Sequence, residues 1–165
     1  MPNRGRRCRI CLRTLTRFWR YSETDPVDKR EFVLRTIPNV IGYYNPEAPQ
    51  LPVLPEAFIP NKKRDPDGLS FCRLDFITAK RFARGNRHAK GVYVAQIGVA
   101  DLMLLGLSVT PSVVPEFPGH VIIPEMRFSE LKTNKHKIKE LALSLARLAS
   151  QNIVYGPTPQ KEQGS

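Results

Sequence analysis

The clearest pattern of apolar positions lies in the second half of the chain. Residues 92–97 (VYVAQI) form an uninterrupted apolar run that is typical of a buried strand. Residues 99–105 fit a short helix, which ends where Gly106 can adopt the left-handed conformation. Two more strands are expected at residues 107–110 and 120–123, so this region predicts several short strands with one helix between them.

The first half of the chain carries fewer strand signals. Residues 31–37 (EFVLRTI) predict a strand or a short helix. The sequence Asp-Pro-Asp-Gly at 65–68 is a strong turn signal, because proline fixes its own φ angle and glycine accepts unusual ones. Residues 69–76 then alternate as a strand, and residues 77–84 fit a short helix with basic residues outward.

Proline dominates the segment between these elements. More than half of the 15 prolines fall within residues 22–66, and proline removes backbone donors and favours extended geometry before it. The apolar and aromatic residues of segment 38–60 predict an extended stretch wrapped on the core. A disordered linker is the alternative.

The C-terminal region predicts a long amphipathic helix that begins at Ser129 or Asn134 and ends near Ser150. Strands and helices do not alternate regularly, which favours an α+β fold with a small mixed or antiparallel sheet. The expected organisation is a basic arm or amphipathic helix over residues 1–21, one α+β domain over residues 22–155, and a disordered tail over residues 156–165.

Charge is distributed unevenly along this organisation. The 165 residues contain 26 Lys and Arg against 15 Asp and Glu, a formal net charge of +11. Residues 1–20 hold seven arginines and no acid, and residues 61–90 hold nine cations and three acids. Concentrated positive charge attracts polyanions in a salt-dependent way, so an anionic partner is expected.

The composition also excludes several classes of protein. No run of apolar residues is long enough to span a bilayer, so no transmembrane segment is expected. Three cysteines cannot close a disulfide framework, which favours a reducing compartment, the cytoplasm. The basic arm leaves four interpretations open: a membrane-surface helix, a nucleic-acid contact, an organelle transit peptide, or a flexible segment.

Nucleic acid is the anionic partner that the pattern favours. The arm and the second basic block supply the candidate contacts, which are Arg9, Arg13, Arg17, Lys62, Lys63, Arg64, Arg81, Arg84, Arg87 and Lys90. Phe71, Phe76 and Phe82 lie between the cations of the second block. Exposed rings there would stack on bases, whereas buried rings would belong to the core.

Two other kinds of chemistry have candidate residues. Arg35, Ser70, His120 and Glu125 occur in an order compatible with a small hydrolase or an ADP-ribosyltransferase-like enzyme that acts on a nucleotide. Cys8 and Cys11 have the spacing of half a zinc site, although no second pair completes it. No cofactor is expected.

Several short motifs carry a resemblance. The elements DGLS at 67–70 and GHVIIP at 119–124, with the segments between residues 33 and 126, resemble a group of short uncharacterised bacterial proteins. This resemblance implies no known activity and no site residues, and the arginine-rich first 20 residues lie outside it.

Together these observations favour a non-catalytic module that binds nucleic acid. A small enzyme built around Ser70 and His120 is one alternative. The other is a protein-binding accessory or toxin–antitoxin component, in which segment 38–60 docks on another chain.

Overall fold

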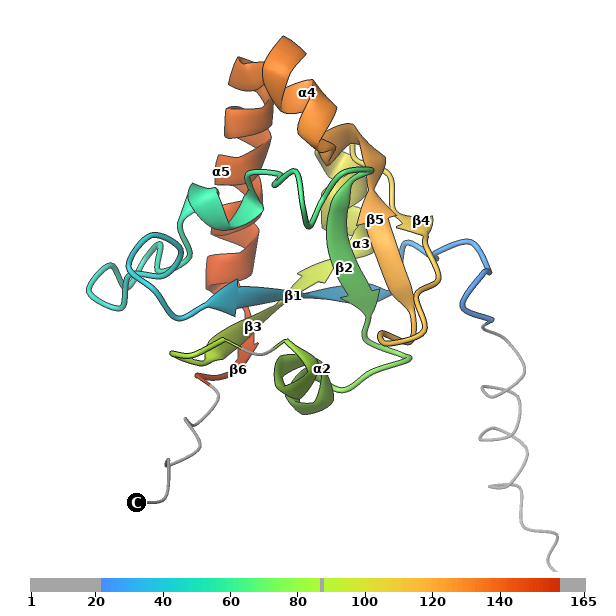
Figure 1. Cartoon of the computed structure of the whole chain (residues 1–165), viewed down its shortest axis with the longest axis horizontal. Helices are drawn as coiled ribbons and strands as arrows, with labels where there is room; N and C mark the ends of the chain where they lie inside the picture. Colours follow the sequence, from blue (N-terminus) through green and yellow to red (C-terminus); the bar gives the residue numbers. More distant parts are fainter. Residues whose placement is uncertain (1–21, 87, 158–165) are drawn as a thin grey trace, which may run out of the picture.

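A computed structural model describes residues 22–86 and 88–157 of the chain. Six strands form one sheet in the order β4-β5-β2-β1-β3-β6, and every neighbouring pair is antiparallel (Figure 1). The strands are β1 (Phe32–Pro38), β2 (Leu69–Arg73), β3 (Val92–Gly98), β4 (Thr110–Pro111), β5 (His120–Ile123) and β6 (Ile153–Tyr155). The predicted α+β fold is therefore confirmed, with an antiparallel sheet.

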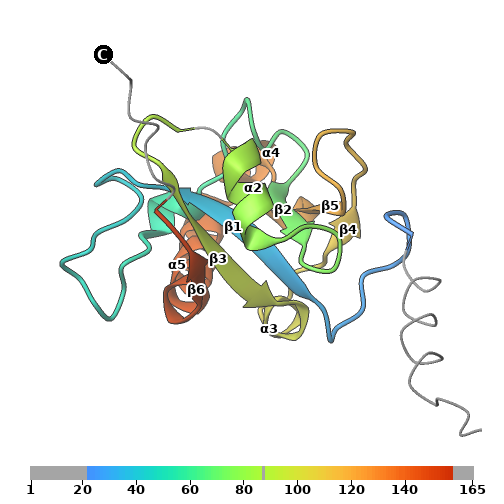
Figure 2. The same cartoon turned by 90° about the horizontal axis from the view of Figure 1, so that it is seen from below.

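Helices cover both faces of this sheet. The helices are α2 (Ala79–Gly85), α3 (Val99–Leu104), α4 (Phe128–Thr133) and α5 (Lys135–Gln151), and the short 3-10 turns are η1 (Pro55–Phe58) and η2 (Pro124–Met126). The long helix α5 crosses one face, and α2 lies on the other, as the two perpendicular views show (Figures 1 and 2).

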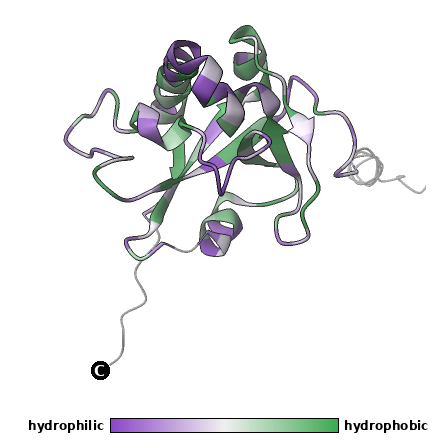
Figure 3. Cartoon of the chain, turned by 45° about the horizontal axis from the view of Figure 1, so that its top comes forward, coloured by the Kyte–Doolittle hydropathy of each residue, from purple (hydrophilic) through white to green (hydrophobic). Residues whose placement is uncertain are grey.

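The main core fills the space between the sheet and α5. Alternate residues of β1, such as Val33 and Ile37, point toward α5 and are fully buried. The helix contributes a buried stripe of Ile138, Ala142, Leu145, Ala146 and Ala149. Three alanines in this stripe let the helix backbone approach the sheet closely. Hydrophilic residues gather at the outer end where α4 meets α5 (Figure 3).

A smaller core lies under α2 on the opposite face. Leu34 of β1 and Cys72 of β2 are buried there against Phe82 of α2. The Phe82 ring also meets Phe117 edge to face, with 5.8 Å between ring centroids. The predicted basic helix is thus present, and its apolar side is fixed to the sheet.

The proline-rich segment wraps on the main core as predicted. Tyr44 and Val53 form an isolated antiparallel bridge, and the Val53 amide donates to Ser150 Oγ at 3.1 Å. This contact fastens the segment to α5 near its C-terminal end. The 3-10 turn η1 then packs against the same helix.

Some element boundaries differ from the sequence predictions. Ser129 and Asn134 were alternative starts of one helix, and the structure has a helix at each position, because the backbone of Asn134 leaves helical geometry between α4 and α5. The strand expected at 107–110 is reduced to β4 at Thr110–Pro111. The helix stop at Gly106 is confirmed, with φ of 74°. Strand β6 was not predicted.

No helix within residues 22–86 and 88–157 combines the length and the apolar character that crossing a membrane requires.

Candidate nucleic-acid interface

The turn before β2 carries three exposed cations, at residues 62–64, while the first acid of the turn, Asp65, points inward. Asp65 is fully buried, and its carboxylate accepts hydrogen bonds from the amides of Asn61 at 3.1 Å and Ser70 at 3.2 Å. The turn ends at Gly68, where a Cβ atom would lie 2.6 Å from the Ile123 carbonyl oxygen, so only glycine fits. The sequence thus closes a tight turn around an inward carboxylate.

Arg35 is the buried partner of this carboxylate. Its Nη1 lies 3.4 Å from Asp65 Oδ1 and donates to the Ser70 carbonyl at 2.6 Å. Its Nη2 donates to the Ala57 carbonyl at 3.3 Å, and the guanidinium lies 5.6 Å from the centroid of the Phe71 ring. Burial lowers the pKa of Arg35, and the neighbouring Asp65 opposes this shift. Arg35 therefore joins β1, β2, η1 and the turn.

The outward cations of the turn lie next to those of α4. The Phe128 amide donates to the Asp65 carbonyl at 3.2 Å, which docks the start of α4 on the turn. Lys132 Nζ lies 5.7 Å from the centroid of the Phe128 ring, so it faces the same junction. The turn surface is defined here by the exposed residues Lys62, Lys63, Arg64, Arg127 and Lys132. Arg127 and Lys132 are not indicated by the sequence pattern, because their place beside the turn depends on tertiary packing.

A second basic region is carried by α2 and the loop after it. Thr78 caps the helix by accepting a hydrogen bond from the Arg81 amide at 3.3 Å. The helix surface is defined here by the exposed residues Lys80, Arg81, Arg84 and Lys90. No acid occurs between residues 76 and 100 of the sequence. The apolar side of α2 packs on the sheet, so its cations face outward.

The two basic surfaces do not merge into one patch. The turn contacts Arg35, whose side chain is on the α5 side of the sheet, whereas α2 covers the other side. In Figure 1 the sheet lies between them. The turn surface and the helix surface are therefore separate, and their cations do not form the shared surface that the charge pattern suggested.

These cations are largely free of acidic partners. The ion pairs within the described ranges use the cations Arg30, Arg35, Arg73, Arg127 and His136. Neither the three cations of residues 62–64 nor any cation of the helix surface has a described carboxylate within ion-pair distance. Their charge is therefore available to an external anion.

The aromatic rings of the basic block do not add to either surface. Phe71 is 1% exposed and Phe82 is 6% exposed. Of the two alternatives left open by the sequence, stacking on bases or packing in the core, both rings therefore follow the second. Phe76 is half-buried beneath the Arg73 guanidinium, which lies 4.8 Å from its ring centroid.

Ser70 and His120 lie on neighbouring strands but have separate hydrogen-bond partners. Ser70 is opposite Ile122, and His120 is opposite Cys72, so the two residues share a face with an offset of two positions. Ser70 Oγ donates to the Arg64 carbonyl at 3.4 Å. His120 Nδ1 donates to the Ser112 carbonyl at 2.6 Å. Ser70 and His120 form no hydrogen bond with each other, so they are not a serine–base pair in this structure.

The other catalytic candidates also have local partners. Glu125 accepts hydrogen bonds from the amide and the hydroxyl of Ser108, the latter at 2.6 Å. Arg35 is enclosed beneath η1, as described above. The structure therefore does not gather Arg35, Ser70, His120 and Glu125 around one cavity.

Several predicted residues lie outside the part of the chain that the structure describes. They are Cys8, Arg9, Cys11, Arg13, Arg17 and Arg87. Within the described ranges, no three His, Cys, Asp or Glu side chains are grouped closely enough to hold a metal ion.

Cys72 is a buried thiol with no disulfide partner among the described residues. Burial, and secondarily the charge of Glu23, raise the pKa of Cys72 to about 12. At pH 8 the thiolate is therefore scarce, and the side chain is fully enclosed.

We expect iodoacetamide to leave Cys72 unmodified in the native protein at pH 8 and to modify it fully in denaturant. Peptide mass spectrometry distinguishes it from Cys8 and Cys11, because a trypsin digest separates residue 72 from the arm. Rapid modification of native Cys72 would contradict the described packing of β2 under α2.

Comparisons with known proteins add no relatives. No family model matches the chain, and no curated protein or solved structure is significantly similar to it.

Proposed function

We propose that this protein is a non-catalytic module that binds nucleic acid through the phosphate backbone. One observation carries the proposal: Lys62, Lys63, Arg64 and the cations of the helix surface are exposed and form no ion pair with a described carboxylate, while the acid Asp65 is buried within the turn. Lysine and arginine side chains in this state neutralise phosphates and release condensed counterions. We place this binding in the cytoplasm, where the free thiol of Cys72 remains reduced.

The two surfaces favour contact with the backbone over reading of bases. Phe71 and Phe82 are buried, so the basic block offers neither ring for stacking. Contacts to phosphates position a protein on a strand but carry no sequence information. Binding is therefore expected to depend weakly on sequence and strongly on salt.

The protein-partner alternative has less support. The proline-rich segment, which was its proposed docking element, directs Val53 and Phe58 into the protein's own core. The enzyme alternative lacks a grouped set of catalytic side chains among the described residues. Both alternatives stay predictions.

The salt dependence of binding tests the proposal. Fluorescence anisotropy with single-stranded and duplex oligonucleotides is measured from about 50 to about 300 mM KCl, the range in which backbone contacts lose most of their affinity. We expect the logarithm of the affinity to fall linearly with the logarithm of the salt concentration. Absence of binding at the lowest salt concentration, or a flat response, would refute the proposal.

Three matched variants locate the contacts. The turn variant Lys62→Gln/Lys63→Gln/Arg64→Gln and the helix variant Lys80→Gln/Arg81→Gln/Arg84→Gln each remove three charges. If a surface contacts phosphates through all three cations, its variant reduces the salt slope by about two to three. The control Lys29→Gln/Arg30→Gln/Arg147→Gln removes three charges elsewhere. An equal loss in all three variants would indicate a general charge effect and contradict a defined interface.

A further inference from the structure

A hollow opens beside the cations of the turn. It has a volume of about 330 Å³, which is at the lower end of the range for small-ligand sites. Its lining comes from the start of the proline-rich segment, from η1 and from the turn: Gly42, Tyr43, Glu56, Ile59, Pro60, Asn61 and Arg64. Two stretches of the chain, residues 42–43 and residues 56–64, therefore meet around one space.

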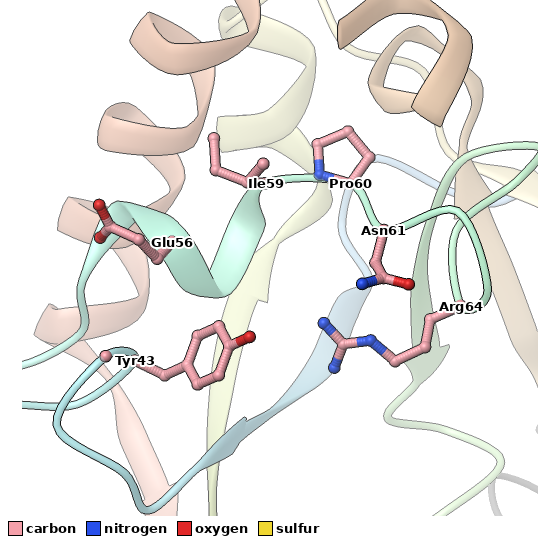
Figure 4. A pocket seen from close by; sticks show the side chains of 7 residues that line it. Tyr43, Glu56, Ile59, Pro60, Asn61 and Arg64 are labelled. Carbon is pink, nitrogen blue, oxygen red and sulfur yellow. The ribbon is translucent and has the colours of Figure 1, made fainter.

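One side of the hollow is rich in hydrogen-bond donors. In Figure 4 the Tyr43 hydroxyl and the Asn61 amide both point toward the Arg64 guanidinium. Asn61 Oδ1 already accepts a hydrogen bond from the Lys63 amide at 2.9 Å, so its amide nitrogen faces the hollow as a donor. Among the described residues, the Tyr43 hydroxyl and the Arg64 guanidinium form no hydrogen bond or ion pair with a side chain. This arrangement suits an acceptor-rich ligand.

The charge around this side is positive. Arg35 is 6% exposed, and its Nε has no hydrogen-bond partner within the described chain. The charge of Arg64 lowers the pKa of Arg35 further than burial alone, so the two guanidiniums repel each other. Asp65 offsets only one of the two charges. An anion in the hollow would offset the other.

The carboxylate of Glu56, which also lines the hollow, does not neutralise the positive charge beside Asn61 and Arg64. Its carboxylate extends away from Asn61 and Arg64 (Figure 4). The hollow is thus polarised, with its donors beside the turn surface on which a nucleic-acid backbone is proposed to lie.

We propose that this hollow binds the terminal phosphate monoester of a nucleic-acid strand, with Tyr43, Asn61 and Arg64 as its ligands. The inference rests on the proposed function, since the strand itself is held by the turn surface. A terminal phosphate carries more charge and has more free oxygens than an internal phosphodiester. It therefore matches a guanidinium fork with two neutral donors better than the backbone does.

Three single-stranded oligonucleotides of one sequence test this proposal. They carry a 5′ phosphate, a 3′ phosphate, or hydroxyls at both ends, with a fluorophore at an internal base. We expect one phosphorylated strand to bind at least about tenfold more tightly than the hydroxyl strand at the same salt concentration. Inorganic phosphate should remove this preference. It should weaken binding of the hydroxyl strand only as much as KCl of the same ionic strength does.

Two variants separate the hollow from the general basic surface. Tyr43→Phe removes one hydroxyl, and Arg64→Lys keeps the charge but removes the planar fork. Both should abolish the preference for the phosphorylated strand. Tyr43→Phe should also leave affinity for the hydroxyl strand within about twofold, because Tyr43 is not part of the turn surface, whereas Arg64→Lys is read from the ratio of the two affinities alone. Arg127→Lys, the matched control on the same surface, should retain the preference. Thermal unfolding midpoints confirm that the variants remain folded.

The outcomes distinguish this inference from the proposed function. Equal binding of the three strands, with a normal salt slope, would overturn the terminal-phosphate site and leave the proposed function standing. If no strand binds but inorganic phosphate raises the unfolding midpoint of the wild type and not of Tyr43→Phe, the proposed function fails. That result would also overturn the proposal that the hollow binds the end of a nucleic-acid strand, and it would indicate a small free phosphate as the ligand.

Discussion

Replacing Arg73 with alanine is expected to lower the free energy of unfolding by about 3–5 kcal/mol, because it strands a buried carboxylate. Arg73 is 0% exposed, and its Nε and Nη2 donate to the two carboxylate oxygens of Glu31 at 2.7 and 2.8 Å. Its Nη1 donates to the Asp25 carbonyl at 3.1 Å. Such a loss is a large part of the stability of a single domain.

Urea denaturation followed by circular dichroism measures this effect. Arg30→Gln is the control, since Arg30 pairs with Asp28 at the surface and its side chain is 80% exposed. We expect a much smaller change from it. The double variant Glu31→Gln/Arg73→Met should lose less free energy of unfolding than the single variants Glu31→Gln and Arg73→Met lose together. The reason is that the double variant leaves neither charge buried without its partner. Additive losses would show that the two side chains do not interact.

Replacing Asp65 with asparagine is the second large change. Asparagine keeps the size of the side chain but leaves the buried guanidinium of Arg35 without its carboxylate, which costs about 3 kcal/mol. The change also weakens the acceptor for the Asn61 and Ser70 amides that closes the turn. We therefore expect lower stability and weaker nucleic-acid binding together.

Asp67→Asn is the matched control for this prediction. Asp67 lies in the same turn but is exposed, so the same substitution should change stability by less than about 0.5 kcal/mol. Removing its negative charge should leave nucleic-acid binding equal or slightly tighter. Equal destabilisation by the two substitutions would contradict the inward orientation of Asp65.

The regular elements were predictable where apolar pattern and stop signals agree. Strand β3 reads as a continuous apolar run, and α3 stops at Gly106 in the left-handed conformation. Strand β6 escaped prediction because three residues are too short to show a period. Its place is set by pairing with β3 at Val94 and Ala95.

The buried charges were not predictable from the sequence. Arginine and glutamate are normally exposed, so Arg73 and Glu31 read as surface residues. Their burial depends on partners 42 positions apart, which only the fold brings together. The sequence indicates Arg35 as a candidate catalytic residue, but in the structure its guanidinium links β2, η1 and the turn through hydrogen bonds.

The candidate interface was predictable in part of its residues, since Arg127 and Lys132 were missed, and not in its arrangement. The turn signal at 65–68 correctly places Lys62 and Lys63 on an exposed segment. It does not reveal that Asp65 turns inward, or that α2 carries its cations to the other side of the sheet. Spacing along the chain cannot show on which face of a sheet a loop lies.

The hydrogen bonds from Arg73 to the backbone of residues 22–25 also fix the point at which the basic arm joins the folded domain. The guanidinium donates to the Asp25 carbonyl and to the Ser22 carbonyl, the latter at 3.5 Å. The chain is thus fixed to the domain directly after residues 1–20, which contain seven arginines. In the proposed function, a strand captured by the domain meets these arginines at high local concentration. Because these arginines are covalently joined to the domain, contacts that they make with the same strand would add to overall avidity.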